Sequence, residues 1–308
     1  MSEVVDVIVA GGGVAGLTAA WHLARIGHGV TVLTGGVPGG HLLNLERIDG
    51  IPGFPEGVAG YDFAPILQEQ AETAGAICSG AEFTGFASDG ALLRVQSSEG
   101  DLTARALVIA TGAKLRRLGV PGEDALRGRG VSDCASCDAP LLRGRAVAVV
   151  GGGDSALQEA LTLAAAGVTV TVLQRAPELS AKRDYQRRIA AHANVLVRCN
   201  VAVEAIEGDA AVTGVALRDL ASGAALRIEV AAVFVFIGLA PDTAAIADSV
   251  NRDDGGAIIT DAALASSRPG VFAAGTVRAG SAFQAIHAAG DGAQVAISVD
   301  RYLSGVDS

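Results

Sequence analysis

The chain has 308 residues, half of them hydrophobic, and its 33 acidic residues outnumber its 23 basic ones to give a net charge of −10. This length fits two domains of ordinary size. The negative charge argues against a nucleic-acid partner, because a phosphate backbone would repel such a surface. The longest apolar run, residues 7–21, contains several glycines and is shorter than the about 18 residues of a membrane span, so no membrane contact is expected. With four cysteines and no secretory signal, the sequence predicts a cytoplasmic protein.

The first functional pattern is a strand, a glycine turn and a helix. An apolar strand over residues 5–10 leads through Gly11-x-Gly13-x-x-Gly16 into a helix of small residues, and a second strand is expected at 30–34. The glycines allow a tight turn, a close approach of the backbone to a pyrophosphate, and close packing of helix on strand. The helix N-terminus offers free N–H groups to the phosphates. In this setting we favour a dinucleotide site over a glycine turn without a ligand.

The next stretch alternates loop, helix and strand. A proline- and glycine-rich loop covers residues 38–60, and a helix is expected near 65–75. A run of strands then ends with the apolar segment 106–110, which stops abruptly at Thr111-Gly112. This ending is typical of a buried strand.

Two cysteines separated by two residues lie near the middle of the chain. Cys134 and Cys137 can close a small disulfide, reopen it and pass two electrons. The alternative is half of a zinc site, which needs another close Cys or His pair, and Cys78 and Cys199 stand alone. Asp138 follows directly and is either a proton donor for thiol–disulfide exchange or a surface or helix-capping residue. The pair lies between the glycine motif described above, a dinucleotide-binding fingerprint, and a second copy of it that begins at Gly151. We therefore expect an electron relay.

The second fingerprint repeats the first at an offset of 140 residues without a gap. A strand over 145–150 leads through Gly151-x-Gly153-x-x-Ala156 into an alanine-rich helix, and a second strand follows at 168–173. Alanine is an accepted third residue of this fingerprint. The repeat predicts a second nucleotide-binding fold.

The residues after that second strand select the nucleotide. An acid there would bind the ribose of NAD, whereas arginine would favour the 2′-phosphate of NADP. The chain has Gln174-Arg175 at this place, with Lys182 and Arg183 as further cations. The sequence therefore leans toward NADPH on one arginine, with NADH or no nicotinamide nucleotide as alternatives.

The C-terminal part of the chain completes two domains. A strand is expected at 231–238, another at 270–276, and a final helix at 282–302. We place a second nucleotide-binding domain that carries the cysteine pair at 113–241, inserted into a first nucleotide-binding domain made of 1–112 and 242–308. The predicted fold class is α/β, with two Rossmann-like three-layer nucleotide-binding domains.

Taken together, the motifs resemble the low-molecular-weight thioredoxin reductase family, FAD-dependent pyridine nucleotide-disulfide oxidoreductases, across essentially the whole chain. Besides the two fingerprints and Cys134-Ala-Ser-Cys137-Asp138, the matching residues are Thr34-Gly35, Gly39-Gly40-His41-Leu42, Pro52-Gly53-Phe54-Pro55, Ala110-Thr111-Gly112 and the stretch 269–275.

The resemblance implies an enzyme that passes hydride from a nicotinamide nucleotide to FAD and electrons from FAD to a disulfide. Cys137 matches the thiol that faces the flavin, Cys134 matches the thiol that attacks the partner's disulfide, and Asp138 matches the proton donor. It also implies that 1–112 with 242–308 is the FAD-binding domain and 113–241 the NAD(P)-binding domain. A rotation between the domains, a homodimer and a thioredoxin-like partner are implied as well.

Fingerprints and resemblance together assign cofactor-binding residues. The residues expected at FAD are Gly11, Gly13, Val14, Ala15, Gly16, Thr34, Gly35, Gly40, His41, Leu42, Ala110, Thr111, Gly112, Gly275, Thr276, Phe283, Gln284 and Ala285. Those expected at the nicotinamide nucleotide are Gly151, Gly153, Asp154, Ser155, Ala156, Arg175 and Gly238. No metal site is expected, because the five histidines lack ligand spacing.

Four departures from the family pattern keep alternatives open. The chain has Gln174-Arg175-Ala176 and Ser180 for an arginine cluster, Gly275-Thr276 for Gly-Asp, Phe283-Gln284 for Arg-Gln, and Asp49-Gly50-Ile51 for the usual Glu-Asn before Tyr-Pro-Gly near the flavin. The first concerns the electron donor and the others the surroundings of the flavin. The alternatives are an FAD- and O2-dependent oxidase of a small-molecule dithiol, a reductase with a donor such as ferredoxin, and a flavin-bound redox sensor without turnover.

Overall fold

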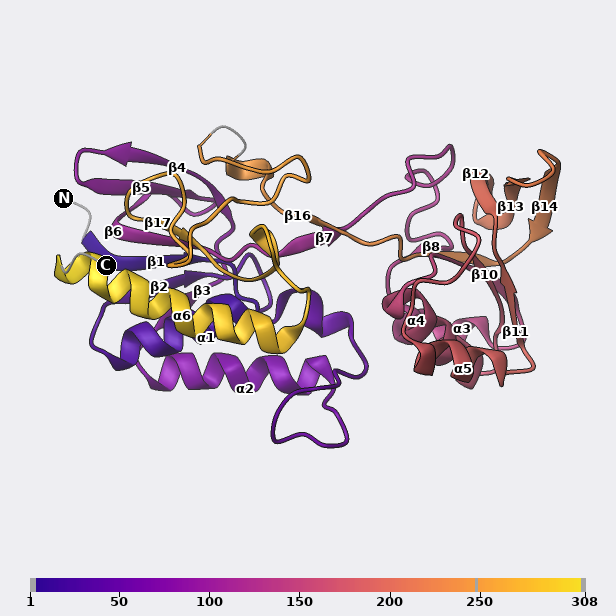
Figure 1. Cartoon of the computed structure of the whole chain (residues 1–308), viewed down its shortest axis with the longest axis horizontal. Helices are drawn as coiled ribbons and strands as arrows, with labels where there is room; N and C mark the ends of the chain where they lie inside the picture. The colour runs from indigo at the N-terminus through magenta and orange to yellow at the C-terminus, as the bar shows by residue number, and fades with distance from the viewer. Residues whose placement is uncertain (1–3, 247–248, 306–308) are drawn as a thin grey trace. The chain divides into compact units, whose positions relative to one another are not determined.

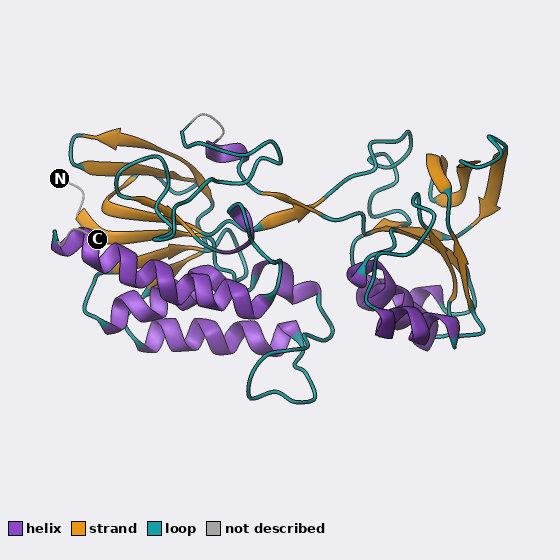
Figure 2. Cartoon of the chain, in the orientation of Figure 1, coloured by secondary structure: helices purple, strands orange, loops and turns teal. Residues whose placement is uncertain are grey.

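The computed structural model describes residues 4–246 and 249–305. The chain divides into two compact units, unit 1 (Met1–Lys114 with Ala240–Ser308) and unit 2 (Leu115–Leu239), and unit 2 is inserted into unit 1 (Figures 1 and 2). These boundaries lie two residues from those expected from the sequence.

Unit 1 is built on a seven-stranded sheet in the order β3-β2-β1-β6-β5-β4, with β17 beside β6. The pairs that join β1, β2, β3, β6 and β17 are parallel, and β4 and β5 add an antiparallel edge. The strands are β1 (Val4–Ala10), β2 (Val30–Leu33), β3 (Ile77–Ser79), β4 (Phe83–Asp89), β5 (Leu92–Ser97), β6 (Leu102–Ile109) and β17 (Val271–Ala273).

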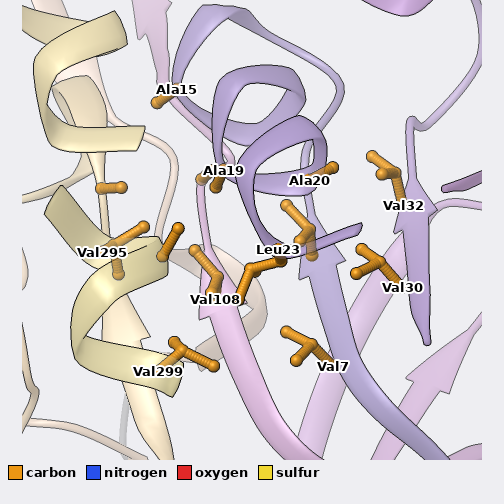
Figure 3. Packing of buried hydrophobic residues seen from close by; sticks show 14 of the residues in the cluster. Val7, Ala15, Ala19, Ala20, Leu23, Val30, Val32, Val108, Val295 and Val299 are labelled. Carbon is orange, nitrogen blue, oxygen red and sulfur yellow. The ribbon is translucent and has the colours of Figure 1, made fainter. Parts of the chain in front are cut away.

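Three helices cover one face of this sheet, as Figures 1 and 2 show. Alternate residues of β1 point to opposite faces, so Val7 packs under the helices with Leu23 and Val299 (Figure 3), while Ile8 packs on the other face. The helices are α1 (Val14–Arg25), α2 (Gly60–Thr73) and α6 (Ala285–Ser304), and the short 3-10 helices are η1 (Gly40–Asn44), η2 (Ala244–Ile246) and η3 (Gly275–Val277).

Unit 2 repeats this plan on a five-stranded parallel sheet in the order β11-β10-β9-β15-β8. Helices α3 (Ala135–Leu142), α4 (Asp154–Ala165) and α5 (Arg183–Ala190) pack against one face, and an antiparallel meander of three strands packs against the other. The sheet strands are β8 (Val131–Ser132), β9 (Ala146–Val150), β10 (Thr169–Leu173), β11 (Val195–Arg198) and β15 (Ala232–Val235), and the meander strands are β12 (Val201–Gly208), β13 (Val212–Asp219) and β14 (Ala225–Glu229).

The duplication extends to the sheet order. The order β3-β2-β1-β6 of unit 1 corresponds to β11-β10-β9-β15 of unit 2, with the glycine turn after the third strand named in each case. The predicted α/β class with two Rossmann-like folds is confirmed. Two short paired strands, β7 (Ala113–Leu115) and β16 (Leu239–Pro241), lie where the chain passes between the units.

Some element boundaries differ from those expected. The helix predicted near 65–75 begins five residues earlier, at Gly60, and keeps Pro65 inside it. The last helix begins at Ala285 rather than 282, because Phe283 has a φ of 53° in the left-handed region, which an α-helix cannot include. The loop at 38–60 contains η1. In the described part of the chain, no helix has the length and apolar character to cross a membrane.

Candidate functional site

The glycine turn of unit 1 is packed so closely that it admits no side chain at two positions. Gly11 has a φ of +118°, and a Cβ there would lie 2.2 Å from the carbonyl oxygen of Ala110. Its N–H donates to the carbonyl oxygen of Leu33 at 2.8 Å. A Cβ on Gly16 would lie 2.0 Å from the carbonyl oxygen of Gly11. The turn is therefore fixed between the ends of β1, β2 and β6.

Gly13 differs from Gly11 and Gly16 because there is empty space where its side chain would be. It is the N-cap of α1, no side chain caps the helix there, and its first turn has no acid. A Cβ on Gly13 would meet nothing within 4 Å. Free N–H groups at a helix N-terminus with room for close approach fit the pyrophosphate of a dinucleotide such as FAD.

Residues from β2 and the following loop border this turn. The Thr34 side chain packs against Gly12, where a Cβ would lie 2.9 Å from the Thr34 Cβ. The Thr34 hydroxyl donates to the carbonyl oxygens of Gly36 at 2.7 Å and Ser79 at 2.9 Å. Thr34 therefore shapes the loop with its own hydrogen bonds.

The turn after β17 closes the same edge of the sheet. A Cβ on Gly112, which follows β6, would lie 3.5 Å from Oγ1 of Thr276, and a Cβ on Gly275 would lie 2.8 Å from Cβ of Ala15. η3 thus sits beside both the start of α1 and the end of β6. Thr276 is half-buried at this edge.

A charged pair holds that turn in place. Asp291 on α6 accepts a hydrogen bond from the N–H of Gly275 at 2.9 Å, and the Arg278 guanidinium donates to both its carboxylate oxygens at 2.6 Å. The side chains are 20% and 13% exposed for Arg278 and Asp291. Hydrogen bonding to the carboxylate raises the pKa of Arg278, so the guanidinium stays charged.

The predicted FAD residues therefore gather at one edge of unit 1, although not all of them are enclosed. Val14 and Leu42 share a small apolar cluster against which Ala285 packs. Five predicted residues are exposed: Gly35, Gly40, His41, Phe283 and Gln284. Gly40 approaches Gly13, Gly35 follows Thr34, and the Thr111 hydroxyl donates to the carbonyl oxygen of Asp242 at 2.7 Å.

The glycine turn of unit 2 reproduces the first. Gly151 has a φ of +132°, its N–H donates to the carbonyl oxygen of Leu173 at 2.9 Å, and a Cβ on it would lie 2.1 Å from the carbonyl oxygen of Phe236. Gly153 is the N-cap of α4, again without a side-chain cap. Gly238, with a φ of +101°, follows β15 as Gly112 follows β6.

The loop after β10 folds over this second turn. The carbonyl oxygen of Gly152 accepts hydrogen bonds from the N–H groups of Ser180 and Ala181, both at 2.9 Å. Asp154, in the first turn of α4, accepts a hydrogen bond from the backbone N–H of Lys182 at 2.7 Å and pairs with its ammonium at 3.2 Å. Ala156 is buried. The loop is thus tied to the helix N-terminus.

Three predicted nucleotide residues at this edge are exposed to solvent, and besides Gly238 two of them carry polar side chains. Ser155 and Arg175 are exposed, and neither has a hydrogen bond or ion pair from its side chain to any residue described by the structure. Both are free to bind a ligand.

The cysteine pair forms a disulfide in unit 2. The Sγ atoms of Cys134 and Cys137 are 2.08 Å apart. Cys134 is the N-cap of α3, and its Sγ accepts a hydrogen bond from the N–H of Cys137 at 3.3 Å. Cys137 is exposed and Cys134 half-buried. Asp138 lies in the first turn of α3, and its carboxylate has no hydrogen-bond or ion-pair partner among the described residues.

The other thiols do not join this site. Burial, reinforced by Glu72, raises the pKa of Cys78 to about 11, and burial followed by Glu178 raises that of Cys199. Both therefore stay protonated near neutral pH and are poor nucleophiles. Over residues 4–246 and 249–305, no group of His, Cys, Asp and Glu is arranged to hold a metal ion.

Sequence reasoning missed the Arg278–Asp291 pair and the contact of Lys182 with Asp154. A signal for the first was present: Arg278 and Asp291 are the only Asp, Glu, Lys or Arg residues between positions 271 and 299. Two opposite charges in an otherwise uncharged segment indicate a pair, since an unpaired buried charge is unfavourable. The second contact depends on a loop conformation without a sequence signature.

Comparison with known proteins places these sites in a family. Residues 5–293 match the pyridine nucleotide-disulphide oxidoreductase family. The chain is 36% identical over 298 residues to a thioredoxin reductase of Treponema pallidum, with 97% of each chain covered. It is 37% identical over 303 residues to a thioredoxin reductase of Mycolicibacterium smegmatis, covering 98% of this chain and 97% of the relative.

A solved structure gives the same answer. The crystal structure of Lactococcus lactis thioredoxin reductase superposes with a TM-score of 0.94 at 32% identity, covering 98% of this chain and 99% of that one. The chain therefore belongs to the pyridine nucleotide-disulphide oxidoreductase family and is an oxidoreductase of the thioredoxin reductase type.

Proposed function

We propose that this enzyme passes electrons from NAD(P)H through FAD and the Cys134–Cys137 pair to a protein disulfide such as that of a thioredoxin. The observation that carries the proposal is the disulfide at the N-terminus of α3, in the same unit as the second dinucleotide fingerprint. The relatives named thioredoxin reductase support the substrate. By the same resemblance we propose that the enzyme works as a homodimer.

FAD, when bound, accepts a hydride and delivers an electron pair to a disulfide. The residues proposed to hold it are at the carboxyl edge of the unit 1 sheet. The N–H groups at the start of α1, beyond Gly13, would bind the pyrophosphate. Thr276 would offer its hydroxyl from η3, fixed by Asp291.

The two cysteines have different surroundings, which supports different roles. The Cys134 sulfur accepts a backbone N–H and lies at a helix N-terminus, an arrangement that stabilises negative charge on sulfur. We assign Cys134 as the thiolate that attacks the partner's disulfide. The attack forms a mixed disulfide and releases one partner thiolate, and Cys137 then closes the Cys134–Cys137 bond and releases the other. Asp138, one turn along α3, would protonate a leaving thiolate.

The nicotinamide nucleotide is assigned to the carboxyl edge of unit 2. Its pyrophosphate would bind at Gly153 and the first turn of α4. No acid lies directly at the end of β10 to bind a ribose diol, and Arg175 is exposed there, so we propose NADPH as the donor.

Anaerobic titration tests the donor. Purified protein, yellow with bound FAD, should be bleached by NADPH, and NADPH oxidation should then couple to reduction of thioredoxin. If neither NADPH nor NADH bleaches the flavin, the proposal is wrong. Oxygen uptake driven by a small dithiol, in place of thioredoxin reduction, would support a dithiol oxidase.

Substitution of one thiol tests the role of the pair. Cys134→Ser should abolish thioredoxin reduction and leave the flavin reducible by NADPH, because only the exchanging sulfur is lost. Cys78→Ser is the matched control, since this protonated thiol lies in β3 of unit 1, and its turnover should remain near that of the parent. Turnover retained in Cys134→Ser would contradict the assignment.

A further inference from the structure

We propose that Arg198, at the end of β11, forms with Arg175 a two-arginine clamp for the 2′-phosphate of the nicotinamide nucleotide. This rests on the proposed binding of that nucleotide in unit 2 and names the residues that would select NADPH over NADH. Arg198 lies 23 positions after Arg175 and belongs to no nucleotide fingerprint.

Backbone hydrogen bonds place the two arginines at the ends of adjacent parallel strands. β10 and β11 are parallel and in register, with Leu173 opposite Arg198 as the last pair. Beyond that pair, the N–H of Gln174 donates to the carbonyl oxygen of Arg198 at 2.8 Å, and the N–H of Asn200 donates to that of Ala176 at 3.1 Å. These two bonds flank Arg175 on one chain segment and Cys199 on the other, so the backbone of Arg175 runs next to that of Cys199, the residue directly after Arg198, at the about 4.8 Å spacing of neighbouring strands.

The Arg198 side chain leaves the sheet at its nucleotide-binding edge. Side chains alternate along a strand, and Val195 and Val197 pack toward the helices. Arg198 therefore points to the opposite face, the face to which Leu173 contributes its buried side chain. Arg175, two residues beyond Leu173, emerges from the same edge.

Neither guanidinium is committed to another group. Most cations of unit 2 are engaged, as in the pairs of Arg117 with Asp124 and Arg127 with Asp133. Within unit 2 as described, the Lys and Arg side chains without a hydrogen bond, ion pair or ring contact are those of Arg145, Arg175, Arg183 and Arg198.

Arg198 is half-buried and has no acidic partner, which is unusual in a chain with a net charge of −10. Arg145 precedes β9 and so lies at the opposite, amino edge of the sheet. Arg175 and Arg198 are thus the uncommitted pair that backbone hydrogen bonds hold together at the carboxyl edge. Arginine binds phosphate oxygens in a bidentate manner, and two of them can surround one dianion.

The test uses 2′,5′-ADP and 5′-AMP, which share the adenosine part and differ in the 2′-phosphate. Isothermal titration of the full-length protein should show tighter binding of 2′,5′-ADP by at least about tenfold. Arg198→Gln should weaken 2′,5′-ADP by about ten- to hundredfold and leave 5′-AMP within about twofold, because a charged hydrogen-bonding group is lost only from the 2′-phosphate.

Two further variants make the result decisive. Arg145→Gln removes an equally uncommitted arginine from the other edge of the same sheet and should change neither affinity. Arg198→Lys retains the charge without the bidentate geometry, so its loss should fall between those of the parent and Arg198→Gln. Arg198→Lys also tests the clamp if Arg198→Gln fails to fold.

The clamp is ruled out if Arg198→Gln affects both ligands equally, if its effect is no larger than that of Arg145→Gln, or if the parent binds both ligands alike. Its failure is separate from failure of the proposed electron transfer. A protein whose flavin is not bleached by NADPH can still show Arg198-dependent binding of 2′,5′-ADP, and a working reductase can lack that dependence.

Discussion

Asp291 makes three hydrogen bonds with a single carboxylate, and all three hold the turn that follows β17. It accepts from the backbone N–H of Gly275 and from two nitrogens of Arg278. Both side chains are mostly buried, so screening by water is limited. The pair thus fixes the position of Thr276 beside Gly112, at the proposed FAD edge.

Asp291→Asn should therefore weaken both the fold and the cofactor site. The amide cannot supply two accepting oxygens, and Arg278 is left charged and mostly buried, with an expected loss of about 1–3 kcal/mol in the free energy of unfolding. FAD affinity should fall as well, because η3 loses its anchor. Urea denaturation and titration of the apoprotein with FAD measure the two effects.

Asp300→Asn provides the control on the same helix. Its carboxylate pairs with His28 at 2.8 Å but is 44% exposed, so its replacement should alter the free energy of unfolding by less than about 1 kcal/mol and leave FAD affinity unchanged. Equal effects of the two substitutions would show that Asp291 has no special role at the turn.

Helices α1 and α6 meet through small residues, and the approach is closest at Gly292. A Cβ on Gly292 would lie 2.5 Å from the carbonyl oxygen of Ala15 and 2.8 Å from Cβ of Thr18. Figure 1 shows the two helices side by side, and Figure 3 shows Ala15 of α1 near the α6 ribbon. The start of α1, where the pyrophosphate is proposed to bind, is thus positioned by α6.

Gly292→Ala should push α6 away from α1 and lower the free energy of unfolding by about 1–3 kcal/mol, as overpacking does. Gly290→Ala, two residues earlier on the same helix, should instead raise the free energy of unfolding. A Cβ on Gly290 meets nothing within 4 Å, and alanine in a helix is about 0.5–1 kcal/mol better than glycine. Urea denaturation of both variants gives the signs, and a common sign would contradict this account of the α1–α6 contact.

Elements with a strong local signal were predictable from sequence. The two glycine fingerprints gave the strand, turn and helix of each unit, because only glycine tolerates the backbone at Gly11 and Gly151. The meander β12–β14 was not predicted. Its edge strand β14 alternates exposed and half-buried residues, and its place is set by packing of Val215 and Leu217 on the unit 2 sheet, which is a long-range contact.

The same distinction between local signals and long-range contacts applies to the site residues. Gly13 and Cys134 are identifiable because their motifs demand particular residue types at fixed spacing. The position of Arg198 beside Arg175 depends on the register of β10 against β11, which local sequence does not specify. The predicted start of the last helix was wrong because Phe283 has a left-handed φ of 53°, which no local sequence pattern indicates.

At the scale of the whole molecule, each unit has its own hydrophobic core. Every one of the five clusters formed by described buried residues draws its members from one unit. The duplication supplies matched positions: Leu17 in α1 and Leu157 in α4 are both 0% exposed and are separated by the 140-residue offset of the repeat. Separate cores predict that damage to one unit does not spread to the other.

Leu17→Ala and Leu157→Ala test this independence. Each removes a fully buried side chain and should lower the stability of its own unit by about 2–5 kcal/mol. Hydrogen exchange resolved by peptide should therefore speed up in residues 4–114 and 240–305 for Leu17→Ala, and in residues 115–239 for Leu157→Ala, because local opening reports local stability. FAD should be lost on heating earlier in Leu17→Ala only. Faster exchange throughout the chain in either variant would mean that the two units unfold as one, and separate cores would then not amount to separate folding units.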